Sequence, residues 1–326
     1  MTGLDEDADE IRIETDALCA AVRKRGYVSG VAGGSFLDKR TGFHDAGFGL
    51  DIVDWLMEPG SDEVYRTQLP AEMVYEWDNP VHGHRPKRCV EGPQICTQAK
   101  QVAPQIIQGA DFVAVQTRWT YHLAAPNKRA GSVWEQTLVF PHDKRYFLSC
   151  DAITTVNASG SDLFLRLDMP GHIRHDGGDT FSEVYLSYGG AVRIPSSAFF
   201  EDFAPDAMFN YRREESRRVP KRFIRAYRLR DPQTGKSGPW LAGMTLLPCV
   251  VTEAWCHQRG YVCFIEEFGP PPGRPPLRAG DTFGAAFLVG YFDSLAEMNR
   301  VYDQHAGYTG LVVDERGWRL TRDEEG

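Results

Sequence analysis

Apolar and polar residues alternate along much of the chain, and a period of two residues predicts β-strands. At residues 163–169 three leucines share one face, while Phe164, Arg166 and Asp168 occupy the other. The same pattern predicts strands at residues 111–119, 132–140, 146–156, 183–188, 239–246, 250–257, 261–266 and 282–291.

Helices are predicted to be few and short. The best candidate is residues 294–305, where Leu295, Met298 and Tyr302 recur at helical spacing. Ser294 and Glu297 form a capping-box pattern at its start. Two stretches rich in Gly and Pro are predicted to be loops, residues 170–179 (PGHIRHDGGD) and 269–276 (GPPPGRPP).

Many strands without alternating helices predict antiparallel sheets stacked face to face. The expected fold is mainly β, a large antiparallel β-sandwich with few short helices. Repeats at a fixed period, which a propeller would show, are absent from the sequence. We expect a single domain over residues 1–326, with a flexible acidic N-terminus (1–10) and a flexible C-terminal tail (321–326).

Composition and charge exclude some classes of binding partner. The 36 Lys and Arg against 45 Asp and Glu give a net charge of −9, which argues against nucleic-acid binding. The sequence contains no apolar run of about 18 residues, so no membrane-spanning helix is expected. Its first residues lack a signal-peptide pattern, and its seven cysteines are scattered. We therefore expect reduced thiols, a cytoplasmic location and no membrane or nucleic-acid partner, with a homo-oligomer left open.

Familiar catalytic motifs are also missing from the sequence. It contains no G-x-S-x-G elbow, Walker A loop, H-E-x-x-H pair or dinucleotide glycine signature. This argues against serine hydrolases, P-loop NTPases, zincins and Rossmann oxidoreductases.

Histidines gather in the middle of the chain, where six of the nine fall between residues 82 and 175. Imidazole suits both proton transfer and metal ligation near neutral pH. His172 and His175 follow the strand that carries Arg166 and Asp168, and His84 precedes another predicted strand. Three interpretations stay open: catalytic histidines, a divalent-metal site completed by nearby carboxylates such as Asp168, and ordinary surface histidines.

A basic segment at residues 211–230 contains nine Lys and Arg and two Glu. Arg222 and Arg225 alternate there with aromatic and aliphatic residues, which predicts guanidinium groups along a partly buried groove. Such groups bind carboxylates, sulfates or phosphates in bidentate fashion. The alternatives are pairing with the acidic surface of the protein or of a partner subunit, and nucleic acid.

Aromatic residues in or beside the predicted strands, including Tyr185, Tyr188 and Trp255, suit a carbohydrate groove, because sugar rings stack on aromatic faces. Core packing explains them equally well. The densest mixture of aromatic, acidic, basic and His residues is 252–267, which holds Trp255, His257 and Glu266.

The serial strands, the early turn LDKRTG (37–42) and the loop NPVHGHRPKR (79–88) together resemble the galactose-mutarotase-like β-supersandwich proteins. That group includes aldose epimerases and domains of several polysaccharide lyases. The resemblance implies a site in a concave sheet where a histidine acts as the general acid and a glutamate acts as the general base. His172 and Glu266 lie at suitable points in chain order.

The leading functional hypothesis is a carbohydrate-active enzyme that acts on an acidic sugar by proton abstraction and β-elimination, as a lyase does. An arginine would neutralise the sugar carboxylate, and a His or Tyr would move the proton. The candidate catalytic residues are His172, His175, Tyr185, Tyr188 and Glu266. The candidate substrate-binding residues are His84, Arg166, Asp168, Arg222, Arg225, Trp255 and His257.

The alternatives are a sugar epimerase or mutarotase, a glycoside hydrolase with two facing carboxylates, and a non-catalytic sugar-binding protein. A metal-dependent oxygenase or isomerase that uses the histidines is a further class. No cofactor is required by the leading hypothesis, and a divalent metal held by histidines is its alternative.

Overall fold

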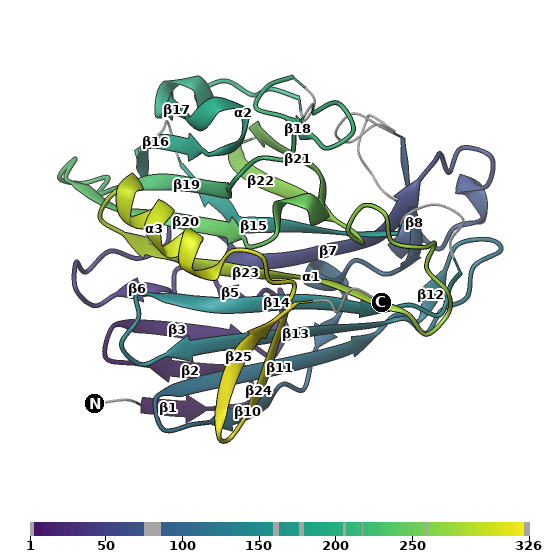
Figure 1. Ribbon diagram of the computed structural model, residues 1–326, viewed down its shortest axis with the longest axis horizontal. Helices are drawn as coiled ribbons and strands as arrows, with labels where there is room; N and C mark the ends of the chain where they lie inside the picture. Colours follow the sequence, from purple (N-terminus) through teal and green to yellow (C-terminus); the bar gives the residue numbers. More distant parts are fainter. Residues whose placement is uncertain are drawn as a thin grey trace.

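A computed structural model of the protein describes residues 3–74, 86–158, 163–175, 179–204, 207–216, 218–258 and 260–322. Within these ranges two large antiparallel sheets pack face to face (Figure 1). The mainly β sandwich that the alternation predicts is therefore confirmed. No helix in the described ranges is long and apolar enough to cross a membrane.

The larger sheet, called the back sheet here, has nine strands among the described residues. In spatial order they are β10 (Gln105–Gln108), β11 (Phe112–Thr120), β13 (Val133–Pro141), β14 (Tyr146–Thr154), β23 (Thr282–Phe292), β20 (Ser237–Thr245), β19 (Phe223–Arg230), β16 (Phe181–Leu186) and β17 (Val192–Pro195).

The second sheet, called the front sheet, has eight strands in the same ranges. Its order is β12 (Leu123–Ala124), β8 (Lys87–Gly92), β7 (Gly49–Pro59), β15 (Phe164–Arg174), β22 (Tyr261–Phe268), β21 (Val251–Gln258) and β18 (Tyr211–Arg212), with β5 (Val31–Ala32) paired to β7.

Smaller elements surround the sandwich. An N-terminal sheet contains β1 (Gly3–Glu6), β2 (Glu10–Glu14), β3 (Leu18–Arg23) and β6 (Leu37–Asp38), and β4 (Arg25–Gly26) pairs with β9 (Lys100–Gln101). A C-terminal hairpin consists of β24 (Gly310–Asp314) and β25 (Gly317–Thr321). The helices are α1 (Ile95–Gln98), α2 (Tyr188–Ala191) and α3 (Leu295–His305), with short 3-10 turns η1 (Arg66–Gln68), η2 (Ala71–Met73), η3 (Ser196–Phe199) and η4 (Pro248–Val250).

Each strand predicted from alternation corresponds to an observed strand of the sandwich, and the predicted helix is α3. Ser294 caps α3, since its side chain accepts a hydrogen bond from the backbone N–H of Glu297. The loop predicted at residues 170–179 is wrong over its first half, because β15 continues through Pro170 as far as Arg174. Residues 3–6 of the acidic N-terminus form β1, which pairs with β2.

The core lies between the two sheets. Along β15 the side chains of Leu165, Leu167 and Ile173 point into it and are fully buried. The outer face of the back sheet is covered by α3 and by the C-terminal hairpin, which form a second apolar layer around Met298 and Tyr302 (Figure 1). The outer face of the front sheet carries polar side chains instead, and this face holds the candidate site.

All seven cysteines lie in the described ranges and are free thiols, as their spacing predicts.

Candidate functional site

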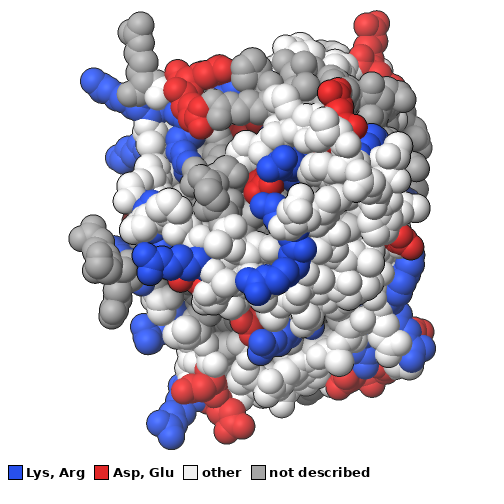
Figure 2. Space-filling view, turned by 90° about the vertical axis from the view of Figure 1, so that its right-hand side faces the viewer, with Lys and Arg blue, Asp and Glu red and all other residues white. Residues whose placement is uncertain are grey.

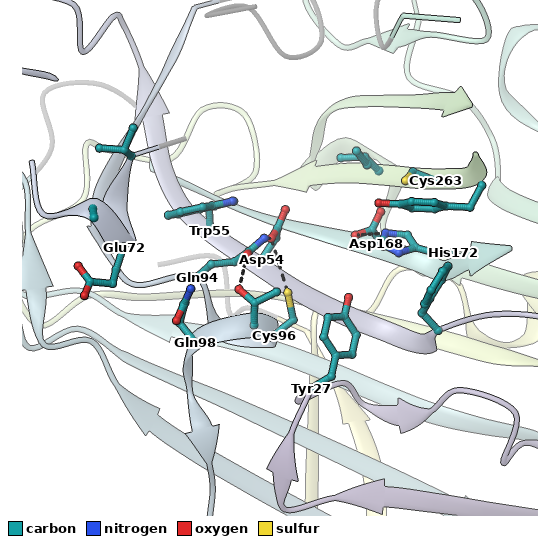
Figure 3. Close-up of a pocket in the computed structure, with 16 residues that line it drawn as sticks. Tyr27, Asp54, Trp55, Glu72, Gln94, Cys96, Gln98, Asp168, His172 and Cys263 are labelled. Atoms are coloured by element: carbon teal, nitrogen blue, oxygen red, sulfur yellow. Dashed lines mark hydrogen bonds and ion pairs between the residues drawn. The ribbon is translucent and has the colours of Figure 1, made fainter. Parts of the chain in front are cut away.

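A cavity of about 620 Å³ lies on the outer face of the front sheet. Strands β7, β15 and β22 supply its floor, and α1, η2 and the segments around Tyr27 and Phe48 supply its walls (Figure 3). Its described lining residues are Tyr27, Phe48, Asp54, Trp55, Ala71, Glu72, Val74, Gln94, Cys96, Thr97, Gln98, Asp168, His172, Tyr261, Cys263 and Ile265.

Asp168 and His172 meet in this cavity because β15 is irregular between them. Asp168 pairs with Ile265 of β22 and His172 pairs with Cys263, so four steps along β15 match two along β22. In a regular strand, residues four apart are separated by about 13 Å. The bulge instead brings His172 Nε2 to 3.0 Å from Asp168 Oδ2.

Cys263 joins this pair from the neighbouring strand. It lies directly across from His172, and the ligand atoms of Asp168, His172 and Cys263 all lie within 4.8 Å of one another. The other carboxylate oxygen of Asp168, Oδ1, is buried and has no hydrogen-bond partner among the described residues. An oxygen, a nitrogen and a sulfur atom that could each bind a metal therefore lie close together on the cavity floor.

A second bulge, in β7, turns Asp54 and Trp55 towards the same cavity. Leu165 and Leu167 of β15 are opposite Leu56 and Val53, so one extra residue is accommodated in β7. Asp54 Oδ1 accepts a hydrogen bond from the Gln94 side chain, and the Cys96 thiol lies 3.8 Å from the same oxygen (Figure 3). Asp54 thus lies beside α1 and lines the same cavity as Asp168 and His172 (Figure 3).

Burial and charge shift the protonation of these groups. Burial, aided by the negative charge of Asp168, raises the pKa of Asp54 to about 7. Burial alone would lower the pKa of His172, but the charge of Asp168 and the contact with Cys263 outweigh it, so that pKa lies well above its ordinary value. Burial also raises the pKa of the Cys263 thiol. The cavity therefore holds a cationic imidazole and a carboxyl group that titrates near neutrality.

Aromatic rings form one wall of the cavity around His172. The centroids of Phe48 and Tyr261 lie 5.9 and 5.2 Å from the imidazole centroid, and 5.0 Å from each other. Trp55 lines the floor on the other side of Asp54 (Figure 3). Apolar ring faces around a few polar groups are typical of small-molecule sites.

A separate ionic cluster occupies the next positions of the front sheet. Arg166 Nη2 lies 2.7 Å from Glu267 Oε1, and Lys87 Nζ lies 3.0 Å from Glu267 Oε2 and 2.5 Å from Glu253. Both cations also lie over the ring of Trp255, at 5.3 Å for Arg166 and 4.4 Å for Lys87. All five side chains are buried, so this cluster is compensated within the protein.

The end of the molecule next to this cluster is shown in Figure 2. Blue Lys and Arg side chains cross its middle, with red Asp and Glu side chains among them. Ion pairs between Lys or Arg and carboxylates are present among the described residues of the front sheet and its loops: Arg88 and Lys128 both lie 2.7 Å from Glu58, and Arg212 lies 3.1 Å from Glu215. The surface is therefore one of mixed charge.

Of the candidate residues predicted from the sequence, Asp168 and His172 lie together in the cavity. Arg166 and Trp255 lie in the adjacent ionic cluster. His175 is buried beyond the cavity, with its Nε2 2.8 Å from the side-chain amide of Gln258. His84 lies outside the described residues, as does the side chain of His257.

The other predicted residues do not line the cavity. Glu266 points into the sandwich core, where it accepts hydrogen bonds from Arg225 at 2.8 Å and from Thr245 at 2.6 Å. Tyr188 is buried in the core against Phe223. Two more lie on the outer side of the back sheet: Tyr185, packed near Trp240, and Arg222, paired with Asp303 at 2.6 Å.

Asp54, Gln94 and Cys263 are site residues that the sequence analysis did not select. A signal for Asp54 exists, because three carboxylates, Asp51, Asp54 and Glu58, interrupt an otherwise apolar run at Gly49–Pro59, which forms a buried strand. A carboxylate in such a run is costly to bury and therefore indicates function or a buried network.

No protein-family model matches the chain. No curated protein matches it either. Among solved structures the chain is similar to a putative aldose 1-epimerase from Escherichia coli K12, with 10% identity and a TM-score of 0.42, over 90% of this chain and 100% of that one. It is also similar to a galactose mutarotase-like protein from Clostridium acetobutylicum, with 8% identity and a TM-score of 0.42, over 90% and 99% of the two chains.

A third similar structure is an alpha-N-acetylgalactosaminidase from Bifidobacterium bifidum, with 11% identity and a TM-score of 0.44. The match covers 93% of this chain but 39% of that enzyme, so the chain spans well under half of its length. The two shorter neighbours have names from the same group that the sequence resembles. All three TM-scores lie below 0.5.

Proposed function

We propose that the protein is a carbohydrate-active enzyme, a mutarotase, that interconverts the anomers of a neutral aldose by acid–base catalysis. The observation that carries this proposal is the pairing of His172 with Asp168, at 3.0 Å, in an open cavity that also holds Asp54. An acid and a base on one small-molecule cavity are what ring opening at an anomeric carbon needs.

The proposed reaction assigns one proton to each group. The carboxylate of Asp54 takes the proton of the anomeric hydroxyl as the C1=O bond forms. The bond between C1 and the ring oxygen breaks, and imidazolium His172 gives its proton to that oxygen. After rotation about the bond between C1 and C2, the reverse steps close the ring with the opposite configuration. Asp168 positions His172 and stabilises its positive charge.

The charge of the cavity supports a neutral sugar in place of the acidic sugar expected from the sequence. The described lining residues include Asp54, Glu72 and Asp168 but no Lys or Arg. A substrate carboxylate would be repelled there.

The elimination mechanism has less support because it needs a cation to neutralise the sugar carboxylate. The arginines expected to supply that cation are instead paired with carboxylates of the protein. Arg166 pairs with Glu267, Arg225 pairs with Glu266, and Arg222 pairs with Asp303.

The test is polarimetry of freshly dissolved anomers of neutral aldohexoses, such as glucose and galactose, with and without the protein. We expect faster relaxation of the optical rotation with the wild-type chain, and a loss of about 10²- to 10⁴-fold in kcat for His172→Asn. His305→Asn is the matched control, because His305 lies on α3 at the outer side of the back sheet. Equal rates for His172→Asn and the wild type would contradict the proposal.

A further inference from the structure

Three side chains on the cavity floor have the ligand types of a zinc site. Asp168 offers a carboxylate oxygen, His172 an imidazole nitrogen and Cys263 a sulfur, and these atoms lie within 4.8 Å of one another. Zinc takes this set of oxygen, nitrogen and sulfur ligands in tetrahedral sites, at about 2.0–2.3 Å from the ion. Binding would require side-chain rotations that bring all three atoms to that distance.

The backbone holds the three positions in place. The bulge in β15 fixes Asp168 next to His172, and the pairing of β15 with β22 fixes Cys263 opposite His172. Ligands on adjacent paired strands need little reorganisation to converge, unlike ligands on loops.

The surroundings of Asp168 give an independent indication of a missing partner. Asp168 is 4% exposed, and its Oδ1 has no hydrogen-bond partner among the described residues. A buried polar atom without a hydrogen-bond partner destabilises the folded chain, and a cation bound to the carboxylate would offset that destabilisation.

We propose that Asp168, His172 and Cys263 bind one zinc ion or a similar thiophilic divalent cation, with the fourth coordination position facing the cavity. Such an ion would replace the contact between His172 and Asp168, so metal binding and the acid–base reaction exclude each other at this site. Zinc would therefore act as an inhibitor of the proposed enzyme. The binding itself is independent of the sugar chemistry and can be measured without a substrate.

The test uses the untagged full chain, dialysed against a chelator and titrated with Co²⁺ and with Zn²⁺. Cobalt bound to a thiolate gives a charge-transfer band in the near ultraviolet. We expect this band to appear at one equivalent of Co²⁺ with the wild type, and to vanish when one equivalent of Zn²⁺ is added. In competition with a chromogenic chelator, Cys263→Ser should weaken zinc binding by more than about 10-fold and lose the cobalt band.

Cys249→Ser is the matched control, because Cys249 is a half-buried thiol that does not line the cavity. His172→Asn provides a second variant that keeps the thiol and should weaken binding similarly, which covers the case in which Cys263→Ser does not fold. Thermal unfolding of each variant verifies the fold.

Several results would overturn the proposal. These are no stoichiometric binding by the wild type, a cobalt band that persists in Cys263→Ser, or equal losses in Cys263→Ser and Cys249→Ser. Stoichiometric zinc binding without any mutarotation would support the metal site and count against the proposed function, so the two failures can be told apart.

Discussion

The protonation of Asp54 depends on its surroundings. It lies at a bulge of β7, accepts a hydrogen bond from Gln94, and has a pKa raised to about 7 by burial and by the charge of Asp168. A base with a pKa near the working pH is partly deprotonated, and so able to accept a proton, while it still binds that proton strongly. Its place opposite the Asp168–His172 pair, and not its position in the sequence, makes it the proposed base.

Asp54→Asn tests this role. The amide keeps the size of the side chain and an oxygen that can accept from Gln94, but it cannot take a proton from a sugar hydroxyl. We expect kcat for mutarotation to fall by about 10²-fold or more, with little change in the melting temperature. Polarimetry and thermal unfolding measure the two quantities. Asp62→Asn serves as the control, because Asp62 is also a buried carboxylate but does not line the cavity. A fully active Asp54→Asn variant would remove Asp54 from the mechanism.

At the level of single residues, two neighbouring glutamates show that alternation in the sequence does not reveal which residue faces the core. Glu266 and Glu267 are consecutive, so one faces the core and the other faces the front side of the sheet. Glu266 binds Arg225 in the core, and Glu267 binds Arg166 on the front face. Glu266 is the glutamate that the sequence pattern suggests for the site, but which face each residue occupies depends on strand pairing that the sequence does not show.

At the level of elements, the strand that carries the site is also the one that departs most from its predicted form. Alternation at residues 163–169 correctly predicts that Arg166 and Asp168 share a face opposite the leucines. Residues 170–174 contain Pro and Gly and read as a loop, yet they complete β15 as the far side of a bulge. Local composition cannot predict the bulge because it depends on pairing with β22 and β7, which are distant in the chain.

Glycines let the backbone pack tightly around this bulge, and Gly171 gives a direct test. A Cβ at Gly171 would lie 2.0 Å from the carbonyl oxygen of Gly49, and the backbone at Gly171 has φ +154°. We expect Gly171→Ala to lower the free energy of unfolding by about 1–3 kcal/mol and to reduce mutarotation, because His172 would shift with the backbone.

Urea unfolding and polarimetry measure these effects. Gly273→Ala is the matched control, since Gly273 also has a positive φ, +86°, but nothing lies within 4 Å of its added Cβ. If both variants lose the same stability, the backbone conformation and not the close contact at Gly171 is responsible.

At the level of the whole molecule, buried polar groups join the two sheets. Asp51 of the front sheet and Asp151 of the back sheet are both fully buried. Gln136 donates to both carboxylates, at 3.2 and 3.1 Å, and Trp134 donates to Asp151 at 2.8 Å. Burial raises the pKa of Asp51 to about 6, and burial and the charge of Asp51 raise that of Asp151 well above its ordinary value.

This pair predicts a pH dependence of stability. A carboxyl group with a raised pKa binds its proton more tightly in the folded than in the unfolded chain, so stability falls as pH rises above the unfolded value of about 4. Asp151→Asn removes one such proton, while its amide oxygen can still accept from Trp134 and Gln136. We expect the stability of Asp151→Asn, relative to that of the wild type, to rise by about 1 kcal/mol per pH unit as the pH rises above about 4.

Urea unfolding at several pH values measures this difference. Asp231→Asn is the control, because Asp231 lies in an exposed turn and its pKa is lowered by backbone hydrogen bonds. A stability difference between Asp151→Asn and the wild type that does not change with pH would show that the pair does not hold an extra proton.

The architecture as a whole follows from the sequence more fully than the site does. Alternation and Gly and Pro punctuation are local signals, and they predict nine strands of the two sheets, α3 and the sandwich class, but not β7, β8 or β19. The site depends instead on long-range pairing: Asp54, Asp168 and Cys263 are distant in sequence and meet through the order of β7, β15 and β22. Local sequence patterns therefore do not group Asp54 and Cys263 with Asp168.

The most direct measurement of the central claim is the rate of anomer exchange, followed by NMR, for a neutral aldose and for the uronic acid with the same ring. The charge of the cavity, with Asp54, Glu72 and Asp168 among its lining residues, predicts exchange that the protein accelerates for the neutral sugar and leaves near the spontaneous rate for the uronic acid. Ultraviolet absorbance from an unsaturated uronate, with no effect on the neutral sugar, would contradict the account and restore the elimination mechanism.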